Sequence, residues 1–227
     1  MHNQPVIVVV IADTHVNHLE ELPPQLLAAL TQADLIIHLG DYTSRELLDE
    51  LRKLGNFYGI AGNHDDPLVH QELKLVEVLE VGGKRLGLIH GMILPFGSLK
   101  RMKAWFRRDG LDAILYGHTH LGTSRLVDGV FFFNPGSVAG KFPAYNGSFG
   151  FLTLDGTVSG EIIPLEHLVA NKRRFLPQFK TILQEGIHWF ETWPYVDFLY
   201  LTSKISLDLK RSSFILRKRM LRNKAGQ

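Results

Sequence analysis

The chain has 227 residues, of which 45% are hydrophobic, and its formal net charge is only +2. This length can bury one substantial core, so we expect one main domain. The absence of cysteine excludes disulfides and thiolate metal ligands. No uncharged apolar run approaches the ~18 residues of a membrane span, and the N-terminus lacks the basic start of a signal peptide. We therefore expect a cytoplasmic protein.

The first third of the chain predicts alternating strands and helices. Short, nearly continuous apolar runs at 6–11, 35–39 and 57–61 are typical of strands that are buried on both faces. Pro23-Pro24 opens a helix between the first two strands, and the segment from Thr43 to Glu46 has a capping-box pattern that starts the next helix. The order strand, helix, strand, helix, strand predicts a parallel sheet.

The following segments predict mainly strands joined by turns. Residues 75–81 and 84–89 indicate a hairpin around Gly82-Gly83, and an apolar pattern over 99–106 indicates a helix. Further strands are predicted at 113–116, 123–127, 130–134, 149–154 and 158–164. The tight turn expected at 134–137, which reads N-P-G-S, would support neighbouring loops from behind.

Five short segments rich in Asp, His and Asn each follow one of the apolar runs. They read D-T-H at 13–15, G-D at 40–41, G-N-H-D at 62–65, H-G at 90–91 and G-H-T-H at 117–120. Polar residues that follow successive buried strands gather at one rim of an α/β sheet. Carboxylate, imidazole and amide oxygen are ligands for Mn, Fe, Co, Ni or Zn. We therefore expect these segments to form one dinuclear metal site.

In this order, the five segments resemble the signature of the calcineurin-like metallophosphoesterases, most closely their small prokaryotic phosphodiesterase branch. The resemblance covers roughly residues 5–164. It implies an α/β fold in which two mixed β-sheets pack together and are flanked by helices, an αββα sandwich. We expect this metallophosphoesterase domain to span 1–164 and to be followed by a C-terminal helical extension at 165–227.

The resemblance also implies two sets of metal ligands with one shared residue. One set is Asp13, His15 and His120, and the other is Asn63, His90 and His118. Asp41 would bridge the two divalent ions, which we expect to be Mn, with Fe, Ni, Co or Zn as alternatives. A bridging carboxylate can hold two cations about 3.5–4 Å apart, as hydrolysis of phosphate esters requires.

Three more residues near these segments have predicted roles. In the family, the histidine at the position of His64 is the general acid beside the leaving group, and an imidazole pKa near 6.5 suits that role. Asp65 resembles the acidic residue that orients this histidine. His38, on the strand before Asp41, either bonds toward a metal ligand or is a satisfied core histidine, and the sequence leaves both readings open.

The extension at 165–227 is basic, whereas residues 1–163 carry a net charge of −5. From residue 164 onward there are 12 Lys and Arg against 5 Asp and Glu, a net charge of +7. Its many aromatic residues favour an amphipathic helix that packs on the main domain or on a second subunit, which would make the protein a homo-oligomer. Binding to nucleic acid or to an anionic membrane surface is the less favoured alternative.

Together these features predict metal-dependent hydrolysis of phosphate esters, with a phosphodiester substrate favoured over a phosphomonoester. The alternative is a non-catalytic, protein-binding scaffold of the same fold, since the retromer scaffold subunit works through protein contacts with an impaired metal site. The complete ligand set and the intact His64 favour the enzyme, because a scaffold has no need of a general acid.

Overall fold

A computed structural model describes residues 5–91, 99–106, 110–141 and 146–165. The chain divides into two units between residues 173 and 174, and every described residue belongs to the first unit. The predicted extension lies outside the described residues except for Leu165, which is buried and donates its backbone N–H to the carbonyl of Gly147. Among the described residues, no helix is long and apolar enough to cross a membrane.

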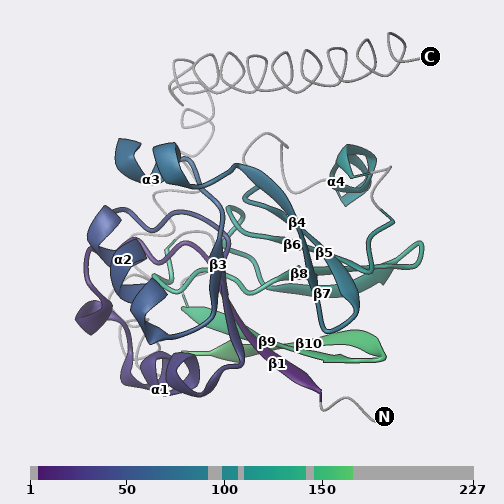
Figure 1. The fold of residues 1–227 in the computed structure, drawn as a ribbon, viewed down its shortest axis with the longest axis horizontal. Coiled ribbons are helices and arrows are strands. Elements are labelled where there is room, and N and C mark those ends of the chain that lie inside the picture. Colours follow the sequence, from purple (N-terminus) through teal and green to yellow (C-terminus); the bar gives the residue numbers. More distant parts are fainter. Residues whose placement is uncertain (1–4, 92–98, 107–109, 142–145, 166–227) are drawn as a thin grey trace, which may run out of the picture. The chain divides into compact units, whose positions relative to one another are not determined.

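The first sheet combines a parallel half with an antiparallel hairpin, in the strand order β10-β9-β1-β2-β3 (Figure 1). β1 pairs in parallel with β2, and β2 with β3, as the alternating pattern predicted. The hairpin of β9 and β10 adds to the other side of β1 in antiparallel register. The strands are β1 (Val6–Ile11), β2 (Leu35–His38), β3 (Phe57–Gly59), β9 (Ser148–Asp155) and β10 (Thr157–Pro164).

The second sheet has the strand order β4-β5-β6-β8-β7 and is also mixed. The predicted hairpin around Gly82-Gly83 forms from β4 and β5, and these two glycines adopt positive φ at its turn. β5, β6 and β8 are parallel, whereas β7 runs antiparallel to β8. The strands are β4 (Val76–Val81), β5 (Lys84–Ile89), β6 (Ala113–Tyr116), β7 (Thr123–Val127) and β8 (Val130–Asn134).

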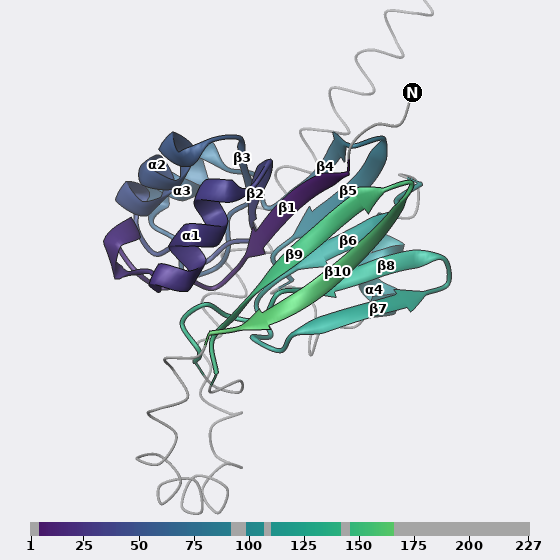
Figure 2. The ribbon, with the colours of Figure 1, turned by 90° about the horizontal axis from the view of Figure 1, so that it is seen from below.

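Helices cover the outer faces of the two sheets (Figure 2). The first sheet is flanked by α1 (Pro24–Gln32), α2 (Arg45–Leu54) and α3 (Pro67–Glu72), and the second by α4 (Leu99–Trp105). A short 3-10 helix, η1 (Leu19–Glu21), precedes α1. The N-cap of α2 is Ser44, one residue later than the capping-box pattern indicates, and its hydroxyl accepts from the backbone N–H of Leu47 at 3.1 Å.

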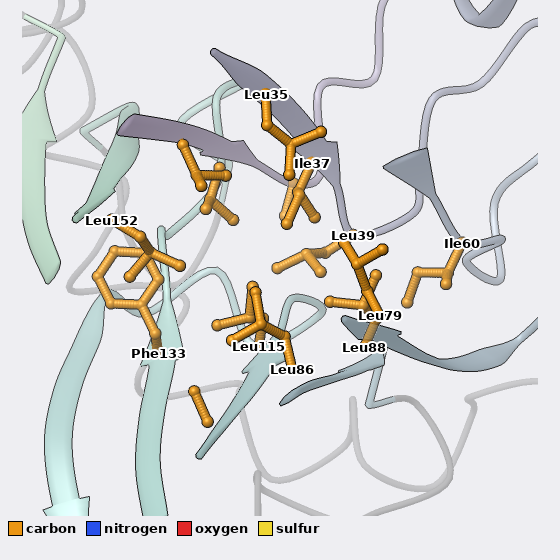
Figure 3. Close-up of a cluster of buried hydrophobic side chains, with 14 of the residues drawn as sticks. Leu35, Ile37, Leu39, Ile60, Leu79, Leu86, Leu88, Leu115, Phe133 and Leu152 are labelled. Atoms are coloured by element: carbon orange, nitrogen blue, oxygen red, sulfur yellow. The ribbon is translucent and has the colours of Figure 1, made fainter. Parts of the chain in front are cut away.

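The main core lies between the two sheets (Figure 3). Side chains alternate along a strand, so Val8 and Val10 of β1 face the second sheet, whereas Val9 and Ile11 pack toward the helices. Ile37 of the first sheet belongs to the same buried cluster as Leu88 and Leu115 of the second. The predicted fold, two mixed sheets flanked by helices, is therefore confirmed for the described residues.

Candidate metal centre

The five polar segments meet where parallel strands of both sheets reach their C-terminal ends. The segments follow β1, β2 and β3 of the first sheet and β5 and β6 of the second. Within the first sheet, the backbone N–H of Asp13 donates to the carbonyl of Gly40 at 3.0 Å. Between the sheets, the backbone N–H of His118 donates to Oδ2 of Asp13 at 3.0 Å. The packing of the two sheets thus brings together residues that lie more than 100 positions apart in the chain.

One group of potential metal ligands consists of Asp13, His15 and His120. Nε2 of His120 lies 3.4 Å from Oδ1 of Asp13, and the rings of His15 and His120 are 5.7 Å apart between centroids. Nδ1 of His120 lies 3.3 Å from the carbonyl oxygen of Lys141, which leaves Nε2 directed at the carboxylate. This group contains the three residues expected to share the first ion.

A second group consists of Asp13, Asp41 and His90, all of them buried. Nε2 of His90 lies 3.4 Å from Oδ2 of Asp41 and 3.1 Å from Oδ1 of Asn63. The ring of His118 packs edge-on against the ring of His90, with 5.2 Å between their centroids. The residues expected to hold the second ion therefore also lie together, and the two groups share Asp13.

The spacing of some of these atoms is close to that of ligands around one divalent cation. Ligands that each lie about 2.1 Å from one cation are roughly 3.0–3.4 Å apart, and the His90–Asp41 and His120–Asp13 separations are both 3.4 Å. Oδ1 of Asp13 is buried and has no hydrogen-bond partner among the described residues. A buried carboxylate oxygen that accepts no hydrogen bond costs free energy unless something cationic binds it. These residues thus fit the metal ions that the resemblance implies.

Electrostatics divide the histidines of the site into two kinds. Burial would lower the pKa of His90, but the carboxylates of Asp41 and Asp13 outweigh it and raise the pKa to about 10. Burial lowers the pKa of His15 and of His118 to about 4, against the attraction of the nearby carboxylates. Despite burial, His90 holds the pKa of Asp41 well below its usual range. Without metal, His90 therefore carries a proton that a cation would have to replace.

The backbone of the ligand loops is held in an unusual conformation. Asp13, His15, Asp41, His118 and His120 all have φ between 50° and 66°. Left-handed conformations are rare and unfavourable for residues other than glycine, and they cluster at functional sites where the surrounding structure enforces them. The loops therefore hold the predicted metal-binding side chains in backbone conformations that lower local stability.

His64 and Asp65 follow Asn63, a predicted ligand, but differ in environment. His64 is exposed, its ring lies 5.7 Å from the ring of His15, and its backbone N–H donates to Oδ1 of Asp41 at 2.8 Å. This places an imidazole at the open edge of the site. Asp65 is buried, and burial raises its pKa.

The carboxylate of Asp65 is surrounded by backbone amides. Its oxygens accept hydrogen bonds from the backbone N–H groups of Asp41, Tyr42, Thr43 and Gly62. No bond between Asp65 and the His64 ring occurs among the described contacts. The predicted role of Asp65 in orienting His64 stays a prediction, while its contacts anchor the Asp41 loop to the Gly62 loop.

The N-P-G-S turn supports the metal loops from behind, as the sequence indicated. The hydroxyl of Ser137 donates to the carbonyl of Asp13 at 3.0 Å. The side-chain amide of Asn134 donates to the carbonyl of Gly117 at 3.0 Å and also bonds Oγ1 of Thr119 at 3.1 Å. This turn fixes one ligand loop from each sheet.

Sequence reasoning missed Lys141, which follows this turn. Its carbonyl bonds the ring of His120, and its exposed ammonium contributes to lowering the pKa of His15. Lys141 belongs to no ligand motif, so only its position four residues after the turn and its link to His120 draw attention to it. It adds a positive charge at the edge of a site that anionic substrates would approach.

Comparison with known proteins identifies the family. Residues 6–157 match the model of the calcineurin-like phosphoesterase superfamily domain, so the chain belongs to this superfamily. A probable metallophosphoesterase of Methanocaldococcus jannaschii is 31% identical over 160 residues, which cover 69% of this chain and 80% of that protein.

Solved structures share the fold. Vps29 of Entamoeba histolytica, determined with zinc, is 29% identical, has a TM-score of 0.56, and matches over 70% of this chain and 98% of its own. A structure described as a novel archaeal phosphodiesterase is 22% identical, with a TM-score of 0.56 over 70% of this chain and 99% of its own. These similarities are consistent with the predicted family and its two-sheet architecture.

Proposed function

We propose that this protein hydrolyses phosphate esters with two divalent metal ions, and that its preferred substrates are phosphodiesters. The observation that carries the proposal is the pair of ligand groups that share Asp13, whose Oδ1 is buried without a hydrogen-bond partner among the described residues. A site built only for packing would satisfy or omit this oxygen. Mn is the metal we expect, with Fe, Ni, Co or Zn as alternatives.

The ligands would divide as the resemblance implies. Asp13, His15 and His120 would hold one ion, and Asn63, His90 and His118 would hold the other. Asp41 would bridge them, because its Oδ2 lies 3.8 Å from Nε2 of His15 and 3.4 Å from Nε2 of His90, one residue of each set. Asn63 contributes a neutral oxygen and so limits the negative charge of the ligand set. When bound, two such ions lower the pKa of water and withdraw charge from the phosphoryl group.

His64 would donate the proton that the departing alkoxide needs. Its ring lies at the exposed edge of the site, near His15, where it can meet a leaving group and exchange protons with solvent. The backbone bond from His64 to Asp41 ties the position of this acid to the bridging ligand. General acid catalysis by a well-placed histidine is usually worth about 10²–10⁴-fold in rate.

The non-catalytic scaffold is the second candidate, because solved structures of Vps29, a vacuolar protein sorting protein and not a named phosphoesterase, share the fold and one of them holds zinc. Metal binding alone therefore does not separate the two functions. Hydrolytic activity separates them, and the histidine at the edge of the site favours the enzyme, because a scaffold has no need of a general acid. The homo-oligomer, the polyanion partners and the cytoplasmic location remain predictions from the sequence.

The test is a panel of substrates assayed with each metal. We expect metal-free protein to regain hydrolysis of bis-p-nitrophenyl phosphate when Mn is added, and to hydrolyse this diester faster than p-nitrophenyl phosphate. Cyclic nucleotides are assayed in the same way as examples of physiological diesters. Asp41→Asn should abolish the rate, whereas Asp49→Asn, which changes a half-exposed carboxylate on α2, should not. No hydrolysis of any ester with any of the five metals would favour the scaffold.

A further inference from the structure

A buried chain of hydrogen bonds runs from β2 to the loop of the bridging ligand. Nδ1 of His38 lies 3.2 Å from the backbone nitrogen of Gly40, and Nε2 lies 3.1 Å from the hydroxyl of Thr14. The hydroxyl of Thr14 donates to the carbonyl of Asp41 at 3.2 Å. Thr14, His38 and Asp41 are all buried. The chain thus connects the segments that follow β1 and β2, each of which carries metal ligands.

The direction of every bond in this chain is determined by chemistry. A backbone N–H can only donate, so Nδ1 of His38 accepts from Gly40 and the proton of the neutral ring resides on Nε2. Nε2 therefore donates a hydrogen bond to Thr14, and the hydroxyl of Thr14 donates one to the Asp41 carbonyl. Burial lowers the pKa of His38 well below 6.5, which agrees with a neutral ring.

The ring of His38 is also held in place from the side. Tyr42 stacks on it with 3.6 Å between ring centroids and 18° between ring planes, and the Tyr42 hydroxyl donates to the His38 carbonyl at 3.3 Å. A Cβ on Gly59 would lie 2.0 Å from that hydroxyl, so only glycine leaves room for it. The imidazole therefore has little freedom to turn away from Thr14.

The carbonyl that receives this chain belongs to a residue in an unfavourable conformation. Asp41 has φ of 62°, and its carbonyl also accepts from the backbone N–H of His15 at 3.3 Å. Local hydrogen bonds are what retain such a conformation against relaxation. A buried imidazole costs free energy unless it is bonded, and apolar residues fill the neighbouring positions of β2. Packing alone gives no reason for histidine at position 38.

We propose that Thr14 and His38 form a positioning relay that holds the Asp41 backbone, and with it the bridging carboxylate, in the geometry that receives metal. Neither residue would touch metal or substrate. The inference rests on the proposed metal site, and it resolves the open reading of His38 in favour of a bond toward a ligand. Partners that orient metal ligands typically contribute 10–100-fold to metal affinity.

Thr14→Val tests the relay, because it removes the hydroxyl at nearly constant volume, and Thr14→Ser is its matched control. His38→Phe removes both nitrogens while keeping a ring that can stack on Tyr42. Leu154→Ala controls for lost stability alone, because Leu154 is a buried residue of β9 that pairs with Val6 at the start of β1, away from the predicted ligands. Manganese binding to each full-length, metal-free variant is measured by calorimetry, together with thermal unfolding.

We expect Thr14→Val and His38→Phe each to weaken manganese binding about 10–100-fold, and Thr14→Ser to stay within about threefold of wild type. The double variant should be no worse than the weaker single variant, because both break one chain. Leu154→Ala should lower the unfolding temperature without changing the affinity.

Three results would overturn the relay. The first is wild-type affinity in Thr14→Val and His38→Phe. The second is an equal loss of affinity in Leu154→Ala, which would make the effect one of general stability. The third is failure of both relay variants to fold while Leu154→Ala folds, which would make Thr14 and His38 folding elements. If wild-type protein itself binds no manganese, the proposed metal site fails instead.

Discussion

Asp65→Asn separates two roles for the residue beside His64. If Asp65 orients His64, the substitution should slow hydrolysis and leave the fold intact. If Asp65 anchors the ligand loops, the substitution should mainly lower the stability of the fold. Its contacts favour the anchor: Oδ1 accepts from Tyr42 at 2.5 Å and Thr43 at 3.2 Å, while Oδ2 accepts from Asp41 at 3.1 Å and Gly62 at 2.6 Å.

The expected loss can be worked out from these four bonds. Asparagine keeps the shape of Asp65, but one of its two ends is an NH₂ group that would face two backbone donors. Each buried N–H left without an acceptor costs about 1–3 kcal/mol, so the total is roughly 2–6 kcal/mol. For a domain of this size, 1 kcal/mol corresponds to about 2–4 °C in Tm, which gives a decrease of roughly 4–24 °C.

Thermal unfolding of the metal-free protein measures this loss. The matched control is Asp66→Asn, because Asp66 caps α3 by accepting from the backbone N–H of Leu68 at 2.7 Å and asparagine caps helices equally well. We expect the control to unfold within about 2 °C of wild type. An Asp65→Asn protein that unfolds like the control, but hydrolyses esters with poor leaving groups slowly, would refute the anchor and support the orienting role.

His64→Ala should keep its metals and lose about 10²–10⁴-fold in rate on a diester with a poor leaving group, with a smaller loss on p-nitrophenyl esters; equal losses would assign His64 another role. As the pH rises from 6 to 8, the dissociation constant for manganese should fall by about tenfold or more per pH unit. The pKa of His90 is about 10 in the metal-free protein, so its proton must leave before the metal binds. A dissociation constant that calorimetry finds independent of pH would contradict this. A chain ending after Leu165 should keep its metal affinity, since every predicted ligand precedes the cut. The same chain should be less soluble, or should elute from gel filtration as a smaller oligomer than the full-length protein. Loss only of salt-sensitive binding to nucleic acid or anionic vesicles would instead favour a docking extension.

The sequence predicted the strands of the fold closely because both periodicity and turn chemistry marked them. β1, β5, β6, β7 and β8 begin and end at the residues that the sequence predicted. The short helix α3 was not anticipated, because Pro67–Glu72 is too brief to show a helical period. The cap of α2 shifted by one residue because Thr43 has φ of 92°, whereas Ser44 has the extended conformation that an N-cap residue needs.

That the candidate ligands lie together was predictable from the sequence, whereas most of the bonds that support their loops were not. Asp13, Asp41 and His90 stand in recognisable segments, and buried parallel strands bring such segments to one rim. The bonds of Thr14, Asp65 and Lys141 depend on how loops from different strands meet, and no local pattern encodes those distances. The sharing of Asp13 between both ligand groups likewise follows from the packing of the two sheets.

Metal stoichiometry followed together with hydrolysis tests the central claim most directly. Manganese is added in steps to metal-free wild-type protein and to Asp41→Asn, and bound ions and the rate on bis-p-nitrophenyl phosphate are measured at each step. We predict that activity develops in the wild type as two ions bind per chain, and that Asp41→Asn binds fewer ions and stays at the background rate. An Asp41→Asn protein that binds two ions and hydrolyses the diester at the wild-type rate would contradict the account.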